Sequence, residues 1–106
     1  MAKPLFVWQE RVLVKIKTEN IIALATEKNY TKIFMPDKKY YFVRTSLVRL
    51  LKKLPKRMFV KTHRAYAVAI ERIEEVYKDH VIVENEGIPV ARQFYNKIVS
   101  HLEVVE

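Results

Sequence analysis

The sequence predicts a single, mostly β domain with two short helices. Apolar residues alternate with polar ones at a period of two, in short runs that cover most of the 106 residues. Helical spacing of apolar residues occurs in only two segments. Repeats, low-complexity tracts and linkers are missing, and this length is enough for one core but not for two.

Short alternating or continuous apolar runs predict the strands. In chain order they cover residues 12–16, 21–25, 29–35, 40–43, 59–62, 70–77 and 81–84. Pro36-Asp37-Lys38-Lys39 separates two of these runs and predicts a hairpin turn. Residues 85–87 predict a second turn. Gly87 is the only glycine, so we expect it to take a positive φ angle in that turn.

Leucine spacing predicts a helix over residues 45–54. The leucines follow an i, i+3, i+4, i+7 pattern: Leu47, Leu50, Leu51 and Leu54. Thr45 or Ser46 can serve as the N-cap, and Pro55 ends the helix. Phe94, Ile98 and Leu102 predict a second, shorter helix over residues 93–102.

Positive charge is concentrated in the first part of the chain. The net charge is +8, with a pI near 9.8. Residues 1–64 hold 16 Lys/Arg and 4 Asp/Glu, a balance of +12, whereas residues 65–106 hold 4 and 8, a balance of −4. Such an uneven distribution favours a basic face and a polyanionic partner, provided that the fold gathers these residues.

The sequence gives little support to an enzyme. None of the three histidines shows metal-ligand spacing, both aspartates fall in predicted turns, and one glycine cannot build a phosphate-binding loop. The chain has no cysteine, which excludes disulfides and thiolate metal sites and agrees with a cytoplasmic location. We therefore expect no catalytic residues, metal or cofactor.

The N-terminal residues do not predict a targeting or membrane segment. Met1-Ala2-Lys3-Pro4 leads into a short apolar stretch that does not have the form of a signal peptide. No apolar run approaches the length that a membrane span requires. We expect a soluble protein that does not associate with membranes.

The first of three basic patches lies at the end of the run that starts at Phe59. Strict alternation would place Phe59 and Lys61 on one face, yet Phe59 is typical of a core and Lys61 of a surface. The strand is therefore expected to end or bulge near Lys61, which leaves His63 and Arg64 on a protruding loop. Cations held there suit contacts with phosphates and base edges.

Two further patches contain polar and basic side chains. One is Lys28-Asn29-Tyr30-Thr31-Lys32, and the other is Ala91-Arg92-Gln93, followed one turn later by Asn96 and Lys97. Each patch by itself is more typical of an ordinary solvated hairpin edge or helix start. The basic run at residues 52–57 favours the helix dipole and adds long-range attraction for phosphates.

The segment that begins at Phe59 also resembles a known family signature. Phe59-Val60-Lys61-Thr62-His63-Arg64-Ala65-Tyr66-Ala67-Val68-Ala69-Ile70 is similar to the central signature of LytTR-type DNA-binding domains. Further matches frame it in order over nearly the whole chain: residues 21–22, 28–30, 44–47 and 88–95. Ala65, Ala69 and Ala91 depart from the Ser, Asn and Ser that are common in the family.

This resemblance implies an elongated set of small antiparallel sheets and a bacterial transcription regulator whose loops enter successive major grooves of double-stranded DNA. Base contacts would fall on Arg64, Arg92, Asn29 and Tyr30. Backbone contacts would fall on Lys28, Lys61, His63, Gln93 and Lys97. The family also implies binding to direct repeats and a sensor or receiver protein upstream. The absence of a coiled-coil seam predicts a monomer in solution.

Two alternatives come from other functional classes. A protein-interaction module would present the basic face to an acidic signalling partner. An RNA-binding β domain would use exposed tyrosines as stacking platforms. The tyrosines available are Tyr30, Tyr40, Tyr41, Tyr66 and Tyr95, and they serve only if the strand faces that carry them are uncovered.

Overall fold

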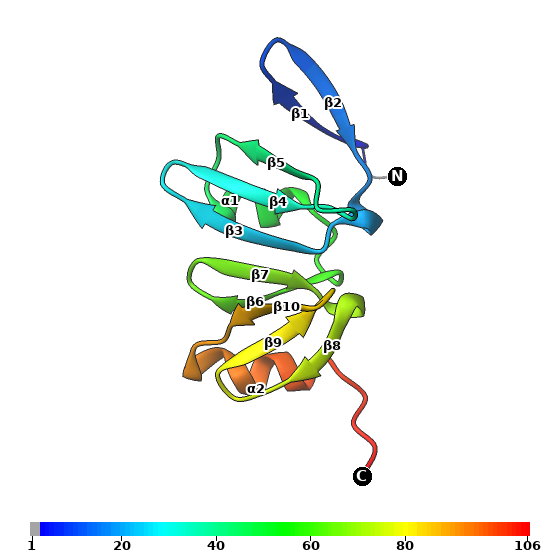
Figure 1. The fold of residues 1–106 in the computed structure, drawn as a ribbon, viewed down its shortest axis with the longest axis vertical. Helices are drawn as coiled ribbons and strands as arrows, with labels where there is room; N and C mark the ends of the chain where they lie inside the picture. Colours follow the sequence, from blue (N-terminus) through cyan, green and yellow to red (C-terminus); the bar gives the residue numbers. More distant parts are fainter. Residues whose placement is uncertain (1–2) are drawn as a thin grey trace.

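Three small antiparallel sheets follow one another along the long axis of the molecule (Figure 1). The computed structural model describes residues 3–106, so Met1 and Ala2 of the predicted domain lie outside the described residues. The described part measures 49 × 32 × 25 Å. The predicted fold class, mostly β and elongated with two short helices, is confirmed.

Residues 3–106 form ten strands and two α-helices. The first sheet pairs β1 (Leu5–Gln9) with β2 (Val12–Ile16). The central sheet has the order β5-β4-β3-β7-β6, with β3 (Ala23–Glu27), β4 (Tyr30–Phe34), β5 (Tyr40–Val43), β6 (Phe59–His63) and β7 (Tyr66–Ala69). The third sheet has the order β10-β9-β8, with β8 (Ile73–Val76), β9 (His80–Val83) and β10 (Glu86–Pro89). The helices are α1 (Leu47–Lys53) and α2 (Arg92–Ser100).

The predicted strands are present, but the prediction of one strand over residues 70–77 is wrong. Residues Ile70–Arg72 form a 3-10 turn between β7 and β8, where the chain passes from the central sheet to the third sheet. The amide of Ile70 donates to the carbonyl of Met58 at 2.9 Å, and this bond anchors the crossing point. The apolar pattern is continuous across the crossing, so alternation alone does not reveal the break.

The prediction for Gly87 is also wrong. Gly87 lies within β10, and the turn between β9 and β10 consists of Glu84 and Asn85, with φ angles of 48° and 67°. A two-residue hairpin turn with positive φ at both positions matches the right-handed twist of its strands. The pairing of Val83 with Glu86 requires such a turn at this point, and asparagine tolerates the conformation well.

The two helices begin differently. Ser46 caps α1, because its hydroxyl oxygen accepts a hydrogen bond from the amide of Arg49 at 3.1 Å, as the sequence predicted. Ala91 stands at the N-cap of α2 and offers no side-chain acceptor. The departure from the family's serine at this position thus leaves the first amide groups of α2 without a cap.

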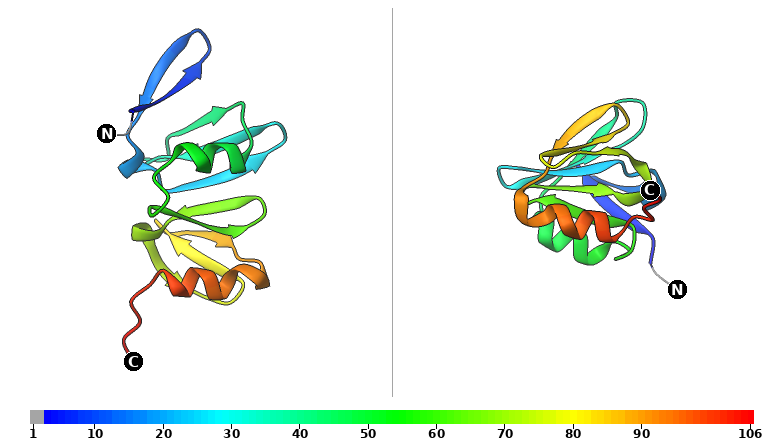
Figure 2. Two further views of the ribbon diagram at one scale, coloured as in Figure 1. Left: turned by 180° about the vertical axis from the view of Figure 1, so that it is seen from behind. Right: turned by 90° about the horizontal axis from the view of Figure 1, so that it is seen from below.

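Two hydrophobic clusters fill the interior, one on each face of the central sheet. In the first, α1 packs on the sheet through Leu47, Leu50 and Leu54, and Phe59 lies in the same cluster. In the second, β9 and β10 pack over β6 and β7 around Val60 and Val68, and α2 adds Ile98 from beside the edge strand β6. Both helices lie on the same side of the molecule when it is seen from behind (Figure 2).

Candidate nucleic-acid interface

Three segments that are far apart in the sequence meet at one edge of the molecule. They are the β3–β4 turn, the β6–β7 turn and the start of α2, all on the left in Figure 1. We call residues 28–30, 63–65 and 91–93 the turn edge. Because β3 and β7 are antiparallel neighbours, the end of β3 lies beside the start of β7, and the amide of Thr26 donates to the carbonyl of Ala65 at 2.8 Å.

A β-bulge shapes the second segment. Lys61 pairs with Ala67, and the next pair is His63 with Tyr66, so Thr62 is the extra residue. The bulge that the sequence predicted near Lys61 is therefore confirmed. The prediction that His63 lies on a protruding loop is wrong, because β6 continues through His63, and only Arg64 and Ala65 form the turn.

His63 holds this turn in place from within the strand. Its Nδ1 accepts a hydrogen bond from the amide of Ala65 at 3.1 Å, and its ring contacts the edge of Tyr66 with centroids 5.7 Å apart. An accepting Nδ1 places the proton of a neutral imidazole on Nε2. The backbone of the turn is thus fixed on one side of Arg64, whose side chain is exposed.

The bulge residue also ties the third segment to the second. The amide of Ala91 donates to the carbonyl of Thr62 at 2.8 Å. The exposed side chains of Arg92 and Gln93 follow directly, in the first turn of α2. This backbone bond links the end of β6, just before Arg64, to the residue that precedes Arg92.

Lys61 lies at the back of this junction. It is half-buried, and its ammonium group lies 5.8 Å from the ring centroid of Phe94 on α2. Lys61 and the exposed Lys97 line one hollow of about 340 Å³ between β6 and the two helices, with Lys56 and His101 as further lining residues. This hollow collects several basic side chains along β6 and α2.

The first segment contributes exposed polar groups. Lys28 and Asn29 form the β3–β4 turn, with Lys28 at a φ angle of 55°. Tyr30 opens β4 and is 42% exposed. The predicted site residues of the first two segments therefore share this edge.

A cleft joins the first two segments to the start of α1. Its volume is about 360 Å³, and Lys28, Asn29, Tyr30 and Arg64 line it together with Thr45, Ser46 and Val48. The sequence did not predict a contact role for Thr45, Ser46 or Val48. The Thr45-Ser46 cap signal placed them at a helix start, but only the folded chain brings that start beside Arg64.

The cations of the turn edge have no anionic partner within residues 3–106. The ion pairs in this part of the chain join Arg72 to Glu84 and His80 to Asp79. Lys28, Arg64 and Arg92 form none, and their side chains are exposed. They remain available to an external anion.

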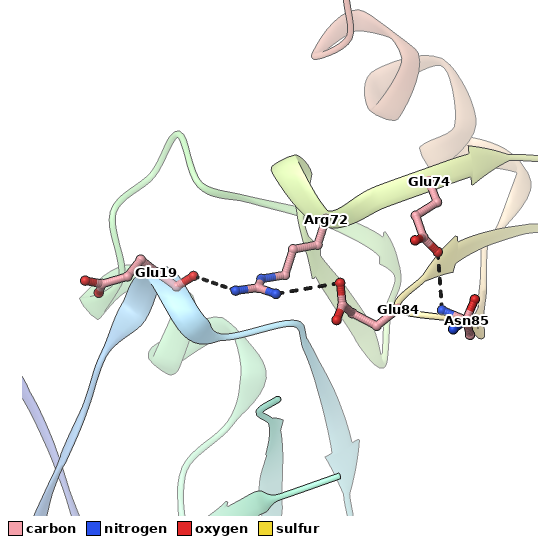
Figure 3. A network of polar contacts seen from close by, with 5 residues as sticks. All are labelled: Glu19, Arg72, Glu74, Glu84 and Asn85. Atoms are coloured by element: carbon pink, nitrogen blue, oxygen red, sulfur yellow. Dashed lines mark hydrogen bonds and ion pairs between the residues drawn. The ribbon is translucent and has the colours of Figure 1, made fainter. Parts of the chain in front are cut away.

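The far edge lies opposite the turn edge, and its arginine is held by groups of the chain itself. We define the far edge by the residues labelled in Figure 3, which are Glu19, Arg72, Glu74, Glu84 and Asn85. Arg72 donates to the carbonyl of Glu19 at 3.0 Å, and its Nη1 lies 3.7 Å from a carboxylate oxygen of Glu84. The carboxylate of Glu74 accepts from the amide of Asn85 at 3.3 Å. These contacts join the first 3-10 turn, Thr18–Asn20, to the third sheet.

Two shifted pKa values belong to the β8–β9 turn, which touches the chain just before α2 through the amide of Val90 and the carbonyl of Asp79. The hydrogen bond from His80 to the Asp79 carboxylate lowers the pKa of Asp79. The hydrogen bond of the Tyr77 hydroxyl to Glu75 raises the pKa of Tyr77. The Tyr77 and His80 rings stack at 4.3 Å, so this turn is a small ordered unit.

Comparison with known proteins identifies the family. The model of the LytTR DNA-binding domain matches residues 11–103, which is most of the chain. The chain belongs to the LytTR DNA-binding domain family. Membership supports DNA binding in transcription regulation for this LytTR domain, and such a domain is a binding unit and not a catalytic one.

A solved structure shares the fold. It is described as the LytTR DNA-binding domain of a methyl-accepting/DNA response regulator from Bacillus cereus, with 18% identity and a TM-score of 0.79. The match covers 94% of this LytTR domain and 97% of that chain. No curated protein sequence matches the chain significantly. Over residues 3–106, neither helix has the length and hydropathy to cross a bilayer.

Proposed function

We propose that this LytTR domain binds specific sequences in double-stranded DNA by placing its turn edge in successive major grooves. The observation that carries the proposal is the gathering of three segments with unpaired cations on one edge of an elongated molecule. The long axis of 49 Å exceeds the helical repeat of about 34 Å, so one edge can reach two neighbouring grooves.

The chemistry of each side chain at the turn edge indicates whether it would contact a base or a phosphate. Arg64 and Arg92 suit bidentate contacts with guanine, and the Asn29 amide suits adenine. Tyr30 borders the same cleft as Asn29 and Arg64 and adds a ring beside the bases. Lys28, Lys61, Gln93 and Lys97 are assigned to phosphates, which position the protein on the duplex. For His63, the engaged Nδ1 leaves only Nε2–H for a phosphate, so its main role is to hold the turn.

The deciding experiment starts with a site selected from random duplexes. Arg64→Ala and Arg92→Ala should each weaken binding to that site by about 1–3 kcal/mol and barely change binding to a scrambled duplex. Arg72→Ala, which removes an arginine from the far edge, is the matched control and should leave both affinities unchanged. Equal losses on both duplexes would show phosphate contacts and would refute the assignment to base edges.

Salt dependence tests the phosphate contacts. Log K should fall linearly with log salt concentration, and Lys61→Ala should reduce the slope by about one unit for every duplex. An unchanged slope would show that Lys61 only packs against Phe94. Parallel titrations with single-stranded RNA and an acidic protein test the two other functional classes, and preference for the acidic protein would favour a protein-interaction module.

The proposal includes the assembly and cellular setting of the domain. We place it in the cytoplasm of a bacterium, as a transcription regulator that answers to a sensor or receiver protein. The free domain is a monomer, and two copies pair only on direct repeats. Sedimentation should show a monomer, and shifting one repeat by half a helical turn should remove any cooperativity. A stable dimer without DNA would contradict this arrangement.

A further inference from the structure

One half of the central sheet leaves a face of aromatic side chains uncovered. On the face opposite α1, the register pairs Phe34 with Tyr40 and Lys32 with Phe42, and Tyr30 continues the row on β4. Tyr40 is 52% exposed, Tyr30 42% and Phe42 38%. We call Tyr30, Lys32, Phe34, Tyr40 and Phe42 the aromatic face. The third sheet packs on β6 and β7 on this side and reaches only Phe34 of β4, which leaves Tyr30, Tyr40 and Phe42 exposed.

A lysine lies at the centre of these rings. The ammonium group of Lys32 is 4.3 Å from the centroid of Tyr40, 4.9 Å from Phe34 and 5.6 Å from Phe42. The rings of Tyr30 and Tyr40 both contact Phe42 in edge-to-face geometry. The face therefore combines π surfaces with a cation that forms no ion pair within residues 3–106.

Additional cations and a hollow lie at the end of the aromatic face. Phe34 and Tyr40 line a hollow of about 380 Å³ together with Lys38 and Lys39 of the β4–β5 turn, and the acidic residues Asp37, Glu84 and Glu86 line it as well. At the other end, Tyr30 is adjacent to Lys28 and Asn29 of the turn edge. The aromatic face is thus bordered by lysines at both ends and is continuous with the surface that we assign to duplex DNA.

We infer that the aromatic face binds unpaired bases of a single-stranded nucleic acid. Rings accept bases of any identity, and the lysines at the centre and at both ends fit the repeating phosphates. A base stacked on an aromatic ring increases affinity by about five- to 150-fold. An exposed cation–π contact contributes only about two- to fivefold, so a base can displace Lys32 from a ring and free it for a phosphate.

This inference differs from the duplex proposal in both surface and ligand. Duplex binding uses groups that project from the turn edge, whereas stacking uses ring faces on β4 and β5, and only Tyr30 belongs to both surfaces. A base pair within a duplex keeps its faces stacked on its neighbours and cannot lie flat on these rings. Either proposal can therefore fail while the other stands.

The test uses the full chain with fluorescently labelled oligo-dT and oligo-rU, in separate arms that distinguish DNA from RNA. Tyr40→Ala should weaken binding to at least one of them by about five- to 150-fold. Tyr77→Ala is the matched control, because Tyr77 is a strand-end tyrosine with 47% exposure outside the aromatic face, and it should have no effect. Tyr40→Phe should retain binding, since it keeps the ring.

Two further variants complete the design. Lys32→Gln should reduce the slope of log K against log salt by about 0.7, the value for one phosphate of a single strand. Arg64→Ala should leave oligo-dT and oligo-rU binding unchanged while it weakens the selected duplex.

Three outcomes would overturn the inference. The first is an equal loss of oligonucleotide affinity for Tyr40→Ala and Tyr77→Ala. The second is no loss of affinity for Tyr40→Ala with either oligonucleotide. The third is that Tyr40→Ala weakens binding only to a synthetic peptide of alternating aspartate and phenylalanine. The last outcome would assign the aromatic face to a protein.

Discussion

The turn edge and the far edge both carry arginines beside strand ends, but only the arginine of the far edge is paired within residues 3–106. At the far edge, Arg72 is held by a carbonyl and a carboxylate that belong to the chain itself. At the turn edge, Arg64 and Arg92 project into solvent without an ion pair within residues 3–106. The cation at the far edge therefore serves the fold, whereas the cations at the turn edge are available for a partner.

The scaffold behind the two edges differs as well. A bulge and a two-residue turn fix the backbone around Arg64, with His63 as a brace, so the backbone is ordered although the side chain is not paired. Around Arg72 it is the side chain that is ordered. A fixed backbone with free side chains favours recognition, because on binding only the side chains and not the turn backbone have to be ordered.

The largest expected effect removes a core side chain at the start of β6, the strand that leads to the turn edge. Phe59 is 7% exposed and lies in the core cluster under α1. Phe59→Ala should lower the free energy of unfolding by about 3–5 kcal/mol, because it opens a cavity. Denaturant unfolding measures this loss. Phe6→Ala is the control, because Phe6 is 47% exposed, and its change should stay small. A stable Phe59→Ala protein that no longer binds DNA would instead place Phe59 in the interface.

A smaller effect separates two buried threonines near the turn edge. Thr31 and Thr62 are both 0% exposed, yet Thr31 donates to the carbonyl of Thr45 at 2.8 Å, while the Thr62 hydroxyl has no hydrogen-bond partner among residues 3–106. Thr31→Val should cost about 1 kcal/mol of stability, since it removes a hydrogen bond. Thr62→Val should be neutral or stabilising, because it removes an unsatisfied polar group. Thermal unfolding of both variants checks the contrast, and equal losses would contradict it.

The two helix starts offer a comparison of similar size. Ser46 caps α1, whereas Ala91 leaves α2 without a side-chain acceptor. Because the amide of Phe94 already donates to the carbonyl of Ala91, Ala91→Ser should supply a side-chain acceptor for the amide of Gln93 and stabilise the protein by about 0.5–1 kcal/mol. Thermal unfolding measures the gain, and Ala91→Gly, which offers no acceptor, is the control. A loss of stability on Ala91→Ser would show that the site has no room for the hydroxyl.

The smallest effect tests the comparison of the edges itself. Arg72→Ala should reduce the free energy of unfolding by less than about 1 kcal/mol, because its ion pair is partly solvent-exposed. Arg64→Ala should leave the free energy of unfolding unchanged. Denaturant unfolding in low and high salt checks both, since the contribution of Arg72 should shrink as salt rises. A stability loss for Arg64→Ala alone would reverse the roles assigned to the two edges.

Much of this fold follows from local patterns in the sequence. Leucine spacing, Ser46 and Pro55 locate α1, because capping and helical periodicity act within a few residues. The conflict between Phe59 and Lys61 predicts an irregularity near Lys61, but the pairing stays regular from Phe59 to Lys61 and the bulge falls at Thr62. Both side chains therefore lie on one face, and Lys61 is half-buried beside Phe94. The alternating pattern across residues 70–77 fails to show the crossing between sheets, because both strands and the 3-10 turn bury apolar residues at similar intervals.

Local sequence patterns predict less about which residues come together in the candidate site. Exposure of Arg64 follows from the local pattern, but the adjacency of residues 28–30, 63–65 and 91–93 depends on the pairing of β3 with β7 and on the bond from Ala91 to Thr62. The sequence also cannot distinguish Arg64 from Arg72, because the partners of Arg72 lie at Glu19 and Glu84, far along the chain in both directions. Pairing between distant strands decides both points.

The bond between Ala91 and Thr62 fixes the spacing between two segments of the turn edge. Since a backbone bond joins the end of β6 to the residue before α2, the interval between the backbones at Arg64 and Arg92 is set by the fold, and only the side chains can adjust to the DNA. Inserting one base pair between the two contacted positions moves the second by about 3.4 Å along the axis and also rotates it about the axis. A fixed backbone interval cannot follow both displacements, so under the proposed function the domain selects the spacing of the contacted bases as well as their identity.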